Sequence, residues 1–574
     1  MNVFTLCMNG LLSIILTLKK TCLIYSWRWS VLNLFILFSP LTQAALPSAG
    51  QAIRDVETTK PSLPPPVALP SSHPEKPQVA VSDATSPRFW VAGFRFEGNQ
   101  AISAERLASL LNKLGGHESS LAQLQEAAQR VTAYYRQQGY VLAHAYLPKQ
   151  EIVDGYVRIA VVEGRYGQIR LVNKSHVRST VLQQPLSGLR SGDIVRGDTL
   201  ERSLLLLSDI SGLLVKNTLS PGAQPGTTDL TVDAASAPWL SGSLQVDNYG
   251  DTYTGEYRGG GVLSVNSPLR LGDQLDLRLL SSDKHQRYYR AAYQLPVGPG
   301  SSHVGIARSQ MNYRLGKDFS ELQAHGDAII NSIFISQPLL RSRAANINAQ
   351  LQFEDKRLRD DIDLFDSRSR KTVALWSAEI GANAQDRLFG GGQSATSLTY
   401  GFGKLTIDDP YARHWDSLTA DTAGQFRKLT FSALRLQNLS ERFQLYAQLN
   451  GQWASGNLDS SEKFGIGGPY GVRAFAPGSG NGDLGWQGSL ELRYSLMPGW
   501  QLSTFVDQGQ ARINKQPWTT EKNTVHMAAA GGSLGWGGEH HQVSLTAALP
   551  LARSSTGGST EKSPRIWIQA ARYF

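Results

Sequence analysis

The sequence from Phe464 to Leu496, FGIGGPYGVRAFAPGSGNGDLGWQGSLELRYSL, joins a glycine-rich loop to a stretch of strict alternation. Between Trp486 and Tyr494, apolar or small residues alternate with the polar residues Gln487, Ser489, Glu491 and Arg493. A period of two is typical of a β-strand whose two faces meet different surroundings. Soluble sheets also contain such strands, so the fold is decided by how many of them follow one another.

Length and composition narrow the classes of protein. The chain has 574 residues, of which 41% are hydrophobic and 18% charged, and its mean hydropathy is -0.25. Beyond the N-terminal leader no stretch is long and apolar enough for a membrane helix. The 55 glycines and 12 tryptophans suit a large β-barrel as well as a soluble protein. The net charge of +9 is scattered, without a basic helix or an aromatic RNA-binding motif, so nucleic-acid binding is not indicated.

The N-terminus has the order of a secretory signal peptide. Basic residues precede the apolar run 31–41, and small residues follow up to Ala44. We therefore expect residues 1–44 to be a signal peptide, with a membrane anchor as the alternative. Both cysteines of the chain lie in this leader, so the mature protein would have none with which to form a disulfide.

A short helix and a stiff tether are expected next. Residues 45–57 contain the sequence GQAIRDVE, a candidate helix, and residues 58–88 are rich in proline. At about 3.1 Å per residue, an extended tether of this kind reaches roughly 80 Å or more. That is enough to carry the helix into a barrel as a plug. The alternative is a disordered N-terminal spacer.

Two tandem α+β modules are predicted between the tether and the long β region. The first, residues 89–164, has the order strand, helix, helix, strand, strand, and the second, residues 165–236, repeats that order more weakly. The main expected elements are a strand over 89–96 and helices over 103–114, 121–138, 178–186 and 199–208.

Residues 237–574 are predicted to form a sixteen-stranded antiparallel transmembrane β-barrel. The sixteen alternating segments begin near residues 240, 257, 274, 288, 303, 328, 347, 372, 395, 427, 443, 486, 501, 525, 542 and 565. Closure of an even-numbered barrel leaves no unpaired edge in lipid. Tight turns are expected after segments two, four, twelve and fourteen, and long polar loops after five, seven, nine, eleven, thirteen and fifteen. Short turns on one side and long loops on the other are typical of outer-membrane barrels.

The faces of the segment beginning at Phe443 support that interpretation. Phe443, Leu449 and Trp453 would meet lipid, while Tyr446 and Gln452 would line the lumen. A mainly polar inner face and an apolar outer face reverse the arrangement of a soluble core.

Several motifs carry a resemblance to a known family. The first module contains FRFEGN, RQQGY and YLPKQEIVDGYVRIAVVEG, with the motif residues Leu147, Pro148, Gln150, Asp154 and Gly155. The β region contains Val472-Arg473-Ala474-Phe475 and the strand motif of Phe505, Asp507 and Gly509. The chain ends on an aromatic residue, Phe574. Together these motifs resemble the two-partner secretion transporters, which export haemolysins and filamentous adhesins.

The resemblance implies a pore in the Gram-negative outer membrane that exports one large partner exoprotein, bound by two periplasmic POTRA modules. It implies no cofactor, no metal and no catalytic site. Loop 6, about residues 455–483, would fold into the lumen, where Arg473 would meet Asp507. Ala474 stands where the family usually has glycine, which would make a positive φ less comfortable. The other implied partners are outer-membrane lipid and the barrel assembly machinery, which would recognise Phe574 during insertion.

Two other functions of outer-membrane barrels are barrel assembly and nutrient uptake. A barrel-assembly factor is the main alternative, but such relatives usually carry three to five POTRA modules and no tethered plug. A nutrient porin would have no reason for the modules. An enzyme is not indicated, because the sequence GGSLG at 531–535 matches a nucleophile elbow yet lies within a predicted strand. The adjacent His540 and His541 are too close in extended chain to converge on one metal.

Overall fold

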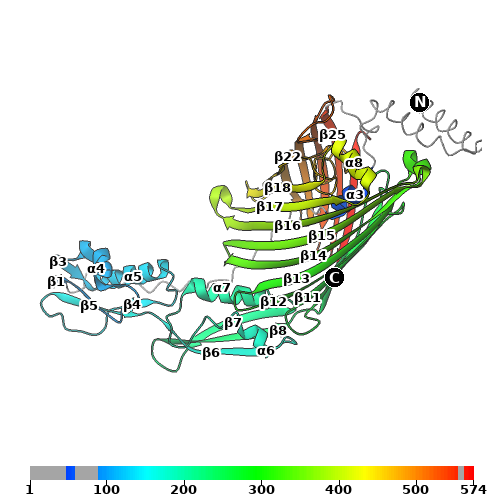
Figure 1. The fold of residues 1–574 in the computed structure, drawn as a ribbon. Coiled ribbons are helices and arrows are strands. Elements are labelled where there is room, and N and C mark those ends of the chain that lie inside the picture. Colours follow the sequence, from blue (N-terminus) through cyan, green and yellow to red (C-terminus); the bar gives the residue numbers. More distant parts are fainter. Residues whose placement is uncertain (1–46, 58–87, 554–561) are drawn as a thin grey trace, which may run out of the picture. The chain divides into compact units, whose positions relative to one another are not determined.

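The computed structural model of the chain describes residues 47–57, 88–553 and 562–574 (Figure 1). The predicted signal peptide and nearly all of the predicted tether lie outside the described residues. Within the described ranges, no helix has the length and apolar character needed to cross a membrane.

The first module combines two small sheets with two helices. Its elements are β1 (Arg88–Val91), β2 (Gly93–Glu97), α4 (Ala104–Leu111), β3 (His117–Ser120), α5 (Leu121–Gln137), β4 (His144–Tyr146) and β5 (Tyr156–Val162). The sheets have the orders β2-β5-β4 and β1-β3. The predicted single strand over 89–96 is wrong, because the chain breaks at Ala92, whose N–H donates to the Gly155 carbonyl at 2.7 Å. The residues before the break pair with β3, which was not predicted.

Serine caps position both helices of this module. Ser103 precedes α4 and Ser120 precedes α5, where it forms a capping box with Gln123. Such caps satisfy backbone N–H groups that a helix leaves without a partner at its start. The apolar faces of α4 and α5 then pack in one buried cluster with β4 and β5.

The second module repeats the topology of the first. Its elements are β6 (Arg165–Lys174), α6 (Ser179–Gln183), α7 (Gly197–Ser208), β7 (Leu213–Pro221) and β8 (Thr227–Ser236). In the sheet β6-β8-β7 the first pair is parallel and the second antiparallel, as in β2-β5-β4. The helix predicted over 178–186 is shorter than expected: α6 ends at Gln183, and Pro185, which has no N–H, cannot donate the hydrogen bond that would continue it.

The prediction of a closed, sixteen-stranded antiparallel barrel is confirmed, and β26 pairs with β9 to close the ring. The strands are β9 (Leu240–Asp247), β10 (Arg258–Asn266), β11 (Gln274–Ser282), β12 (Arg287–Val297), β13 (Ser302–Arg314), β14 (Ala324–Arg341), β15 (Ala345–Ile362), β16 (Ser367–Asp386), β17 (Gly392–Ile407), β18 (Gly424–Asn438), β19 (Phe443–Ala454), β22 (Leu484–Met497), β23 (Trp500–Arg512), β24 (Thr524–Gly537), β25 (His541–Arg553) and β26 (Arg565–Tyr573).

Exposure alternates along the strands as predicted. In β19, Phe443, Leu449 and Trp453 are 41%, 42% and 46% exposed, whereas Tyr446 and Gln452 are buried. The inside of the barrel is therefore the more enclosed face, and large apolar side chains cover the outside.

One predicted long loop is absent from the described part of the barrel. The connection after the seventh strand is only residues 363–366, because β15 and β16 are 18 and 20 residues long and extend their ladder almost to the turn. Several central strands thus exceed the length of about 9 to 11 residues that spanning the membrane requires. The first strand, β9, has 8 residues.

Two helices and a long loop also belong to the barrel region. Helix α3 (Ala49–Glu57) buries Ala49, Ala52, Ile53 and Val56, a spacing that places them on one helix face. Loop 6, residues 455–483, joins β19 to β22 and contains the paired short strands β20 (Phe464–Gly465) and β21 (Asn481–Gly482). A short helix, α8 (Pro410–Leu418), lies between β17 and β18.

Candidate functional site in the barrel lumen

The tip of loop 6 is fixed to the barrel wall by Arg473. Its guanidinium donates to both carboxylate oxygens of Asp507, each at 2.8 Å, to Glu491 at 3.0 Å and to the Ser489 hydroxyl at 2.9 Å. It also stacks 3.2 Å from the centroid of the Phe505 ring. The structure thus brings the predicted residues Arg473 and Asp507 together, while their role in transport stays a prediction.

Burial makes this contact energetically consequential. The side chain of Asp507 is 0% exposed, that of Glu491 11% and that of Arg473 13%. Arg493 holds the second oxygen of Glu491 at 2.9 Å. In an enclosed site a charge that loses its partner is poorly solvated, so each of these groups depends on the others.

An apolar cluster packs the loop tip against the wall. Val472 and Phe475 of the loop are buried with Ile466 against Phe505 and Met527. The lumen was predicted to be mainly polar, yet this part of it is not. The signal in the sequence was the inward run of Val525, Met527 and Ala529 in β24, which repeats an apolar side chain at every second position.

Ala474 does not adopt the positive φ at which alanine would be less comfortable than glycine. Among the described residues, the non-glycine positions with positive φ do not include Ala474. The loop makes its left-handed turns instead at Gly468, Gly478 and Gly480, where φ is 113°, 78° and 67°. Ala474 is buried and needs no special backbone conformation, so alanine in place of glycine introduces no strain.

The start of loop 6 is fixed by a second set of buried charges. Glu462 is 0% exposed and lies between Lys356, at 2.8 Å, and Lys428, at 2.7 Å. Asp459 binds Lys371 at 2.7 Å. These lysines come from β15, β16 and β18, so the first segment of the loop is bound to three strands of the wall. Sequence reasoning missed these contacts.

Helix α3 lies in the lumen against this same loop segment. Arg54 donates to the carbonyls of Ser460 and Lys463 at 3.0 and 2.8 Å, and to the Asn481 side chain at 2.9 Å. One guanidinium therefore bridges the outgoing and returning parts of loop 6. Gly50 permits the close approach, because a Cβ there would lie 2.8 Å from the Ser461 nitrogen.

The two ends of α3 contact the barrel wall. At the N-terminal end, the Ala49 N–H donates to Asp360 of β15 at 2.7 Å. At the C-terminal end, Arg278 of β11 donates to the Val56 carbonyl at 3.0 Å, and Tyr288 of β12 donates to Glu57 at 3.1 Å. A cation at a helix C-terminus is electrostatically favourable.

The motif residues of the first module shape its sheet. Asp154 and Gly155 have φ of 55° and 75°, as the two central residues of a tight hairpin turn into β5 require. The Gln150 amide accepts from the Arg158 N–H at 2.7 Å and donates to the Arg158 carbonyl at 2.8 Å, as a neighbouring strand would. Leu147 packs against the module's buried clusters.

Two motif residues remain, Pro148 in the first module and Phe574 at the C-terminus. Pro148 follows Leu147 and accepts from the Gln150 amide through its carbonyl. Burial and the hydrogen bond to Glu163, at 3.0 Å, raise the pKa of Tyr135 in the module core, so its hydroxyl stays protonated as a donor. Phe574 exchanges two backbone hydrogen bonds with Gly242 and leaves its ring 53% exposed.

Gly509 completes the strand motif on the lumenal face of β23. A Cβ at this position would lie 3.2 Å from the Val472 side chain and 3.3 Å from Ile466. Glycine there lets loop 6 lie close to the wall.

Among the described residues, no group of three or more histidine, cysteine, aspartate or glutamate side chains could hold a metal ion.

Comparison with known proteins extends these observations. Residues 226–538 match the family described as haemolysin secretion/activation protein ShlB/FhaC/HecB, and residues 89–164 match the ShlB-type POTRA domain. The heme/hemopexin transporter protein HuxB of Haemophilus influenzae is 26% identical over 83% of this chain and 85% of its own length. The outer membrane transporter CdiB of Dickeya dadantii is 24% identical over 78% of this chain and 80% of its own length.

A solved structure shows the same fold. CdiB from Escherichia coli superposes with a TM-score of 0.68 at 20% identity, over 96% of this chain and all of that one. Fold and comparisons together define an outer-membrane β-barrel transporter with POTRA modules on its periplasmic side.

The family match covers more than half of the chain, and the chain belongs to the haemolysin secretion/activation (ShlB/FhaC/HecB) family. It is a two-partner secretion transporter, a pore that moves a partner exoprotein from the periplasm to the cell surface.

Proposed function

We propose that the chain captures one large unfolded exoprotein at its two periplasmic modules and passes it through a lumen that α3 closes at rest. The observation that carries the proposal is the seat of α3, which Arg54 binds to both parts of loop 6 inside the ring of strands. A sixteen-stranded barrel leaves a water-filled lumen, which would leak solutes if nothing obstructed it. The proposal assigns no bond-making step, cofactor or metal to the chain.

Free strand edges support capture by the modules. In the described sheets β2 pairs only with β5, and β7 pairs only with β8. An unpaired edge can accept an extended peptide as an additional strand, through main-chain hydrogen bonds that make few demands on its sequence. We assign capture to the first module, residues 89–164, with the second module, residues 165–236, extending the contact.

The contacts of α3 and loop 6 suggest which of the two moves. The helix is held mainly by hydrogen bonds from partly exposed side chains, with Arg54 16% exposed and Glu57 27%. The loop is held by ion pairs whose carboxylates, on Asp459, Glu462 and Asp507, are 0 to 3% exposed. Breaking buried ion pairs costs more than breaking the part-buried hydrogen bonds that hold the helix. In the proposed cycle α3 leaves the lumen and loop 6 remains.

Deletion of residues 89–164 tests the function. The variant should retain a barrel whose electrophoretic mobility changes on heating, while one exoprotein disappears from the cell surface and medium. The full-length chain serves as the control in the same strain. Unchanged secretion by the variant would contradict capture by the first module.

A second experiment, removal of the whole chain, separates secretion from barrel assembly. Cells that lack the whole chain should lose one exoprotein and keep their other outer-membrane barrels, as quantitative proteomics of membranes and medium would show. General loss of outer-membrane barrels would instead favour the assembly function. The terminal Phe574 is proposed to serve only in insertion of the chain itself.

A further inference from the structure

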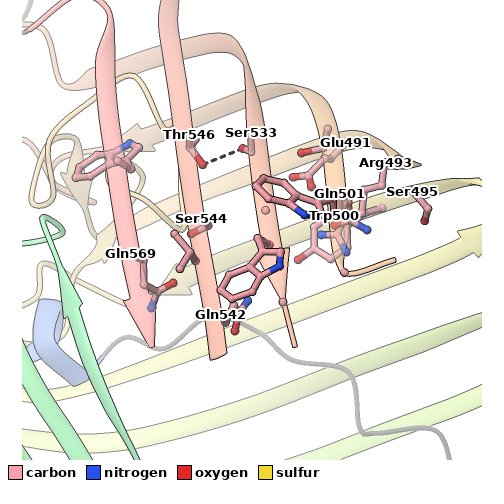
Figure 2. Close-up of a pocket in the computed structure, with 18 of the residues that line it drawn as sticks. Glu491, Arg493, Ser495, Trp500, Gln501, Ser533, Gln542, Ser544, Thr546 and Gln569 are labelled. Carbon is pink, nitrogen blue, oxygen red and sulfur yellow. Dashed lines mark hydrogen bonds and ion pairs between the residues drawn. The ribbon is translucent and has the colours of Figure 1, made fainter. Parts of the chain in front are cut away.

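A second lumenal feature lies apart from the seat of α3. A cavity of about 1220 Å³ lies against the wall formed by β22 to β26, between the loop tip at Arg473 and the turns at 498–499 and 538–540. Those turns belong to the periplasmic end of the barrel, where the chain enters β9 from the second module. We call this cavity the vestibule. Figure 2 shows part of its lining.

The vestibule wall formed by β23 to β26 presents amides and hydroxyls beside three tryptophans, Trp500, Trp536 and Trp567. The amides and hydroxyls come from all four strands: Gln501, Ser503, Ser533, Gln542, Ser544, Thr546 and Gln569. Figure 2 shows Gln542, Ser544 and Thr546 one after another along β25, with Ser533 bound to Thr546 at 2.8 Å. Of the charged residues in the lining, Arg473, Glu491 and Arg493 are paired with one another, and Arg442 and Glu539 are the other two.

The neighbouring cavity differs in charge. It has a volume of about 770 Å³, contains the C-terminal half of α3 in its lining, and is bordered by the cations Arg258, Arg278, Lys356, Lys428 and Lys463 and by the carboxylates of Asp55, Glu57 and Glu462. The two cavities share Tyr249, Gln448 and the loop-6 residues Pro469, Tyr470 and Gly471. The vestibule lining contains no residue of α3. A ligand can therefore enter the vestibule from the periplasm while the helix is still seated.

We propose that the vestibule binds the main chain of an extended polypeptide before α3 is displaced. The proposal rests on the proposed export function and adds a binding site separate from the POTRA edges. The ligand class is an unfolded peptide segment, recognised by its N–H and C=O groups. Amide side chains and hydroxyls both donate and accept, so they can satisfy either backbone group of any sequence.

The spacing of the wall fits such a ligand. Inward side chains of one strand recur at every second residue, about 6.7 Å apart, which equals the rise of two residues in an extended peptide. A peptide that follows β25 past Gln542, Ser544 and Thr546 would meet an equivalent partner after each two-residue step. Each neutral hydrogen bond strengthens binding by only about two- to tenfold. Weak repeated contacts let a chain bind and still advance.

Photo-crosslinking with the full-length chain tests this site. A photoreactive amino acid replaces Gln501, and the probe is a biotinylated 20-residue peptide of alternating glycine and serine, added to detergent-solubilised protein. The matched probe carries N-methylglycine in place of each glycine, which removes half of its backbone donors. We expect the crosslink yield to fall about tenfold or more with the N-methylated probe. Equal yields would overturn recognition through the main chain.

Variants of the wall locate the contact. Gln542→Leu, Ser544→Ala and Thr546→Val together should lower the yield with the glycine-serine probe by about tenfold or more. Thr430→Val, on the lumenal face of β18 and in the lining of neither cavity, is the matched control and should leave it unchanged. A heat-modifiable barrel verifies folding of both. An unchanged yield in the triple variant would overturn the assignment of the site. Secretion by the unmodified chain would still decide the export function separately.

Discussion

Replacement of Arg473 by alanine should release the tip of loop 6. The substitution removes the partner of Asp507, whose side chain is 0% exposed, and one of the two partners of Glu491. Removing one member of a buried ion pair typically costs about 3–5 kcal/mol, because the remaining charge stays unsolvated. At 1.4 kcal/mol per factor of ten, the ratio of docked to undocked loop should fall by roughly two to three and a half orders of magnitude.

Cysteine labelling measures that ratio directly. Both cysteines of the chain precede residue 45, so after removal of the predicted signal peptide Ala476→Cys would provide a single thiol. Ala476 is 8% exposed beside the loop tip, and a maleimide reaches it only when the tip undocks. Labelling in membranes should accelerate at least about a hundredfold in the Arg473→Ala background. Secretion should fall while the barrel remains.

Two comparison variants make the result decisive. Arg435→Ala removes an ion pair with Asp386 whose side chains are about 30% exposed, and such pairs contribute only about 0–1 kcal/mol. It should leave labelling unchanged. Combining Arg473→Ala with Asp507→Asn removes the orphaned charge and should slow labelling relative to Arg473→Ala alone. If Arg473→Ala alone leaves labelling unchanged, or the double variant labels as fast as the single one, the reasoning is refuted.

Three other predictions concern the helix and the start of the loop. Deleting residues 47–57 should raise planar-bilayer conductance and antibiotic entry while sparing most secretion; unchanged conductance would exclude α3 as the plug. Gly50→Val should raise conductance in the same way, since its side chain would collide with loop 6, and a current equal to that of the unmodified chain would argue against this seat. Glu462→Gln should leave Lys428 without its carboxylate partner and Lys356 with Glu354 alone, and should cost about 3–5 kcal/mol, seen as a lower temperature for the heat-dependent mobility shift. An unshifted temperature would count against that clamp.

The spacing of apolar residues along the sequence correctly predicted where individual strands and helices lie. The strand that begins at Phe443 is found at that residue, and α5 matches the predicted helix over 121–138 to within one residue. Glycine and proline were a less reliable guide to where the turns lie. The tight turn at 363–366 carries no glycine or proline signal, so long strands were mistaken for shorter ones with a loop between them.

Side-chain partners were predictable only where a motif named them. The contact of Arg473 with Asp507 was expected from the resemblance, and the structure places the two together. The contacts of Glu462 join it to residues 106 and 34 positions away in the sequence, and nothing in a single sequence links residues so far apart. No motif singled out Glu462, and only the tertiary fold buries it between two lysines.

The covalent attachment of α3 to the barrel has a kinetic consequence. Residues 58–87 connect the helix to the first module, and thirty residues span at most about 100 Å even when fully extended. A displaced helix therefore stays within a volume that corresponds to an effective concentration on the order of 0.4 mM or higher. Its return to the lumen is a first-order event that does not depend on how much of the protein the cell makes. Each pore can thus reseal itself after its cargo has left.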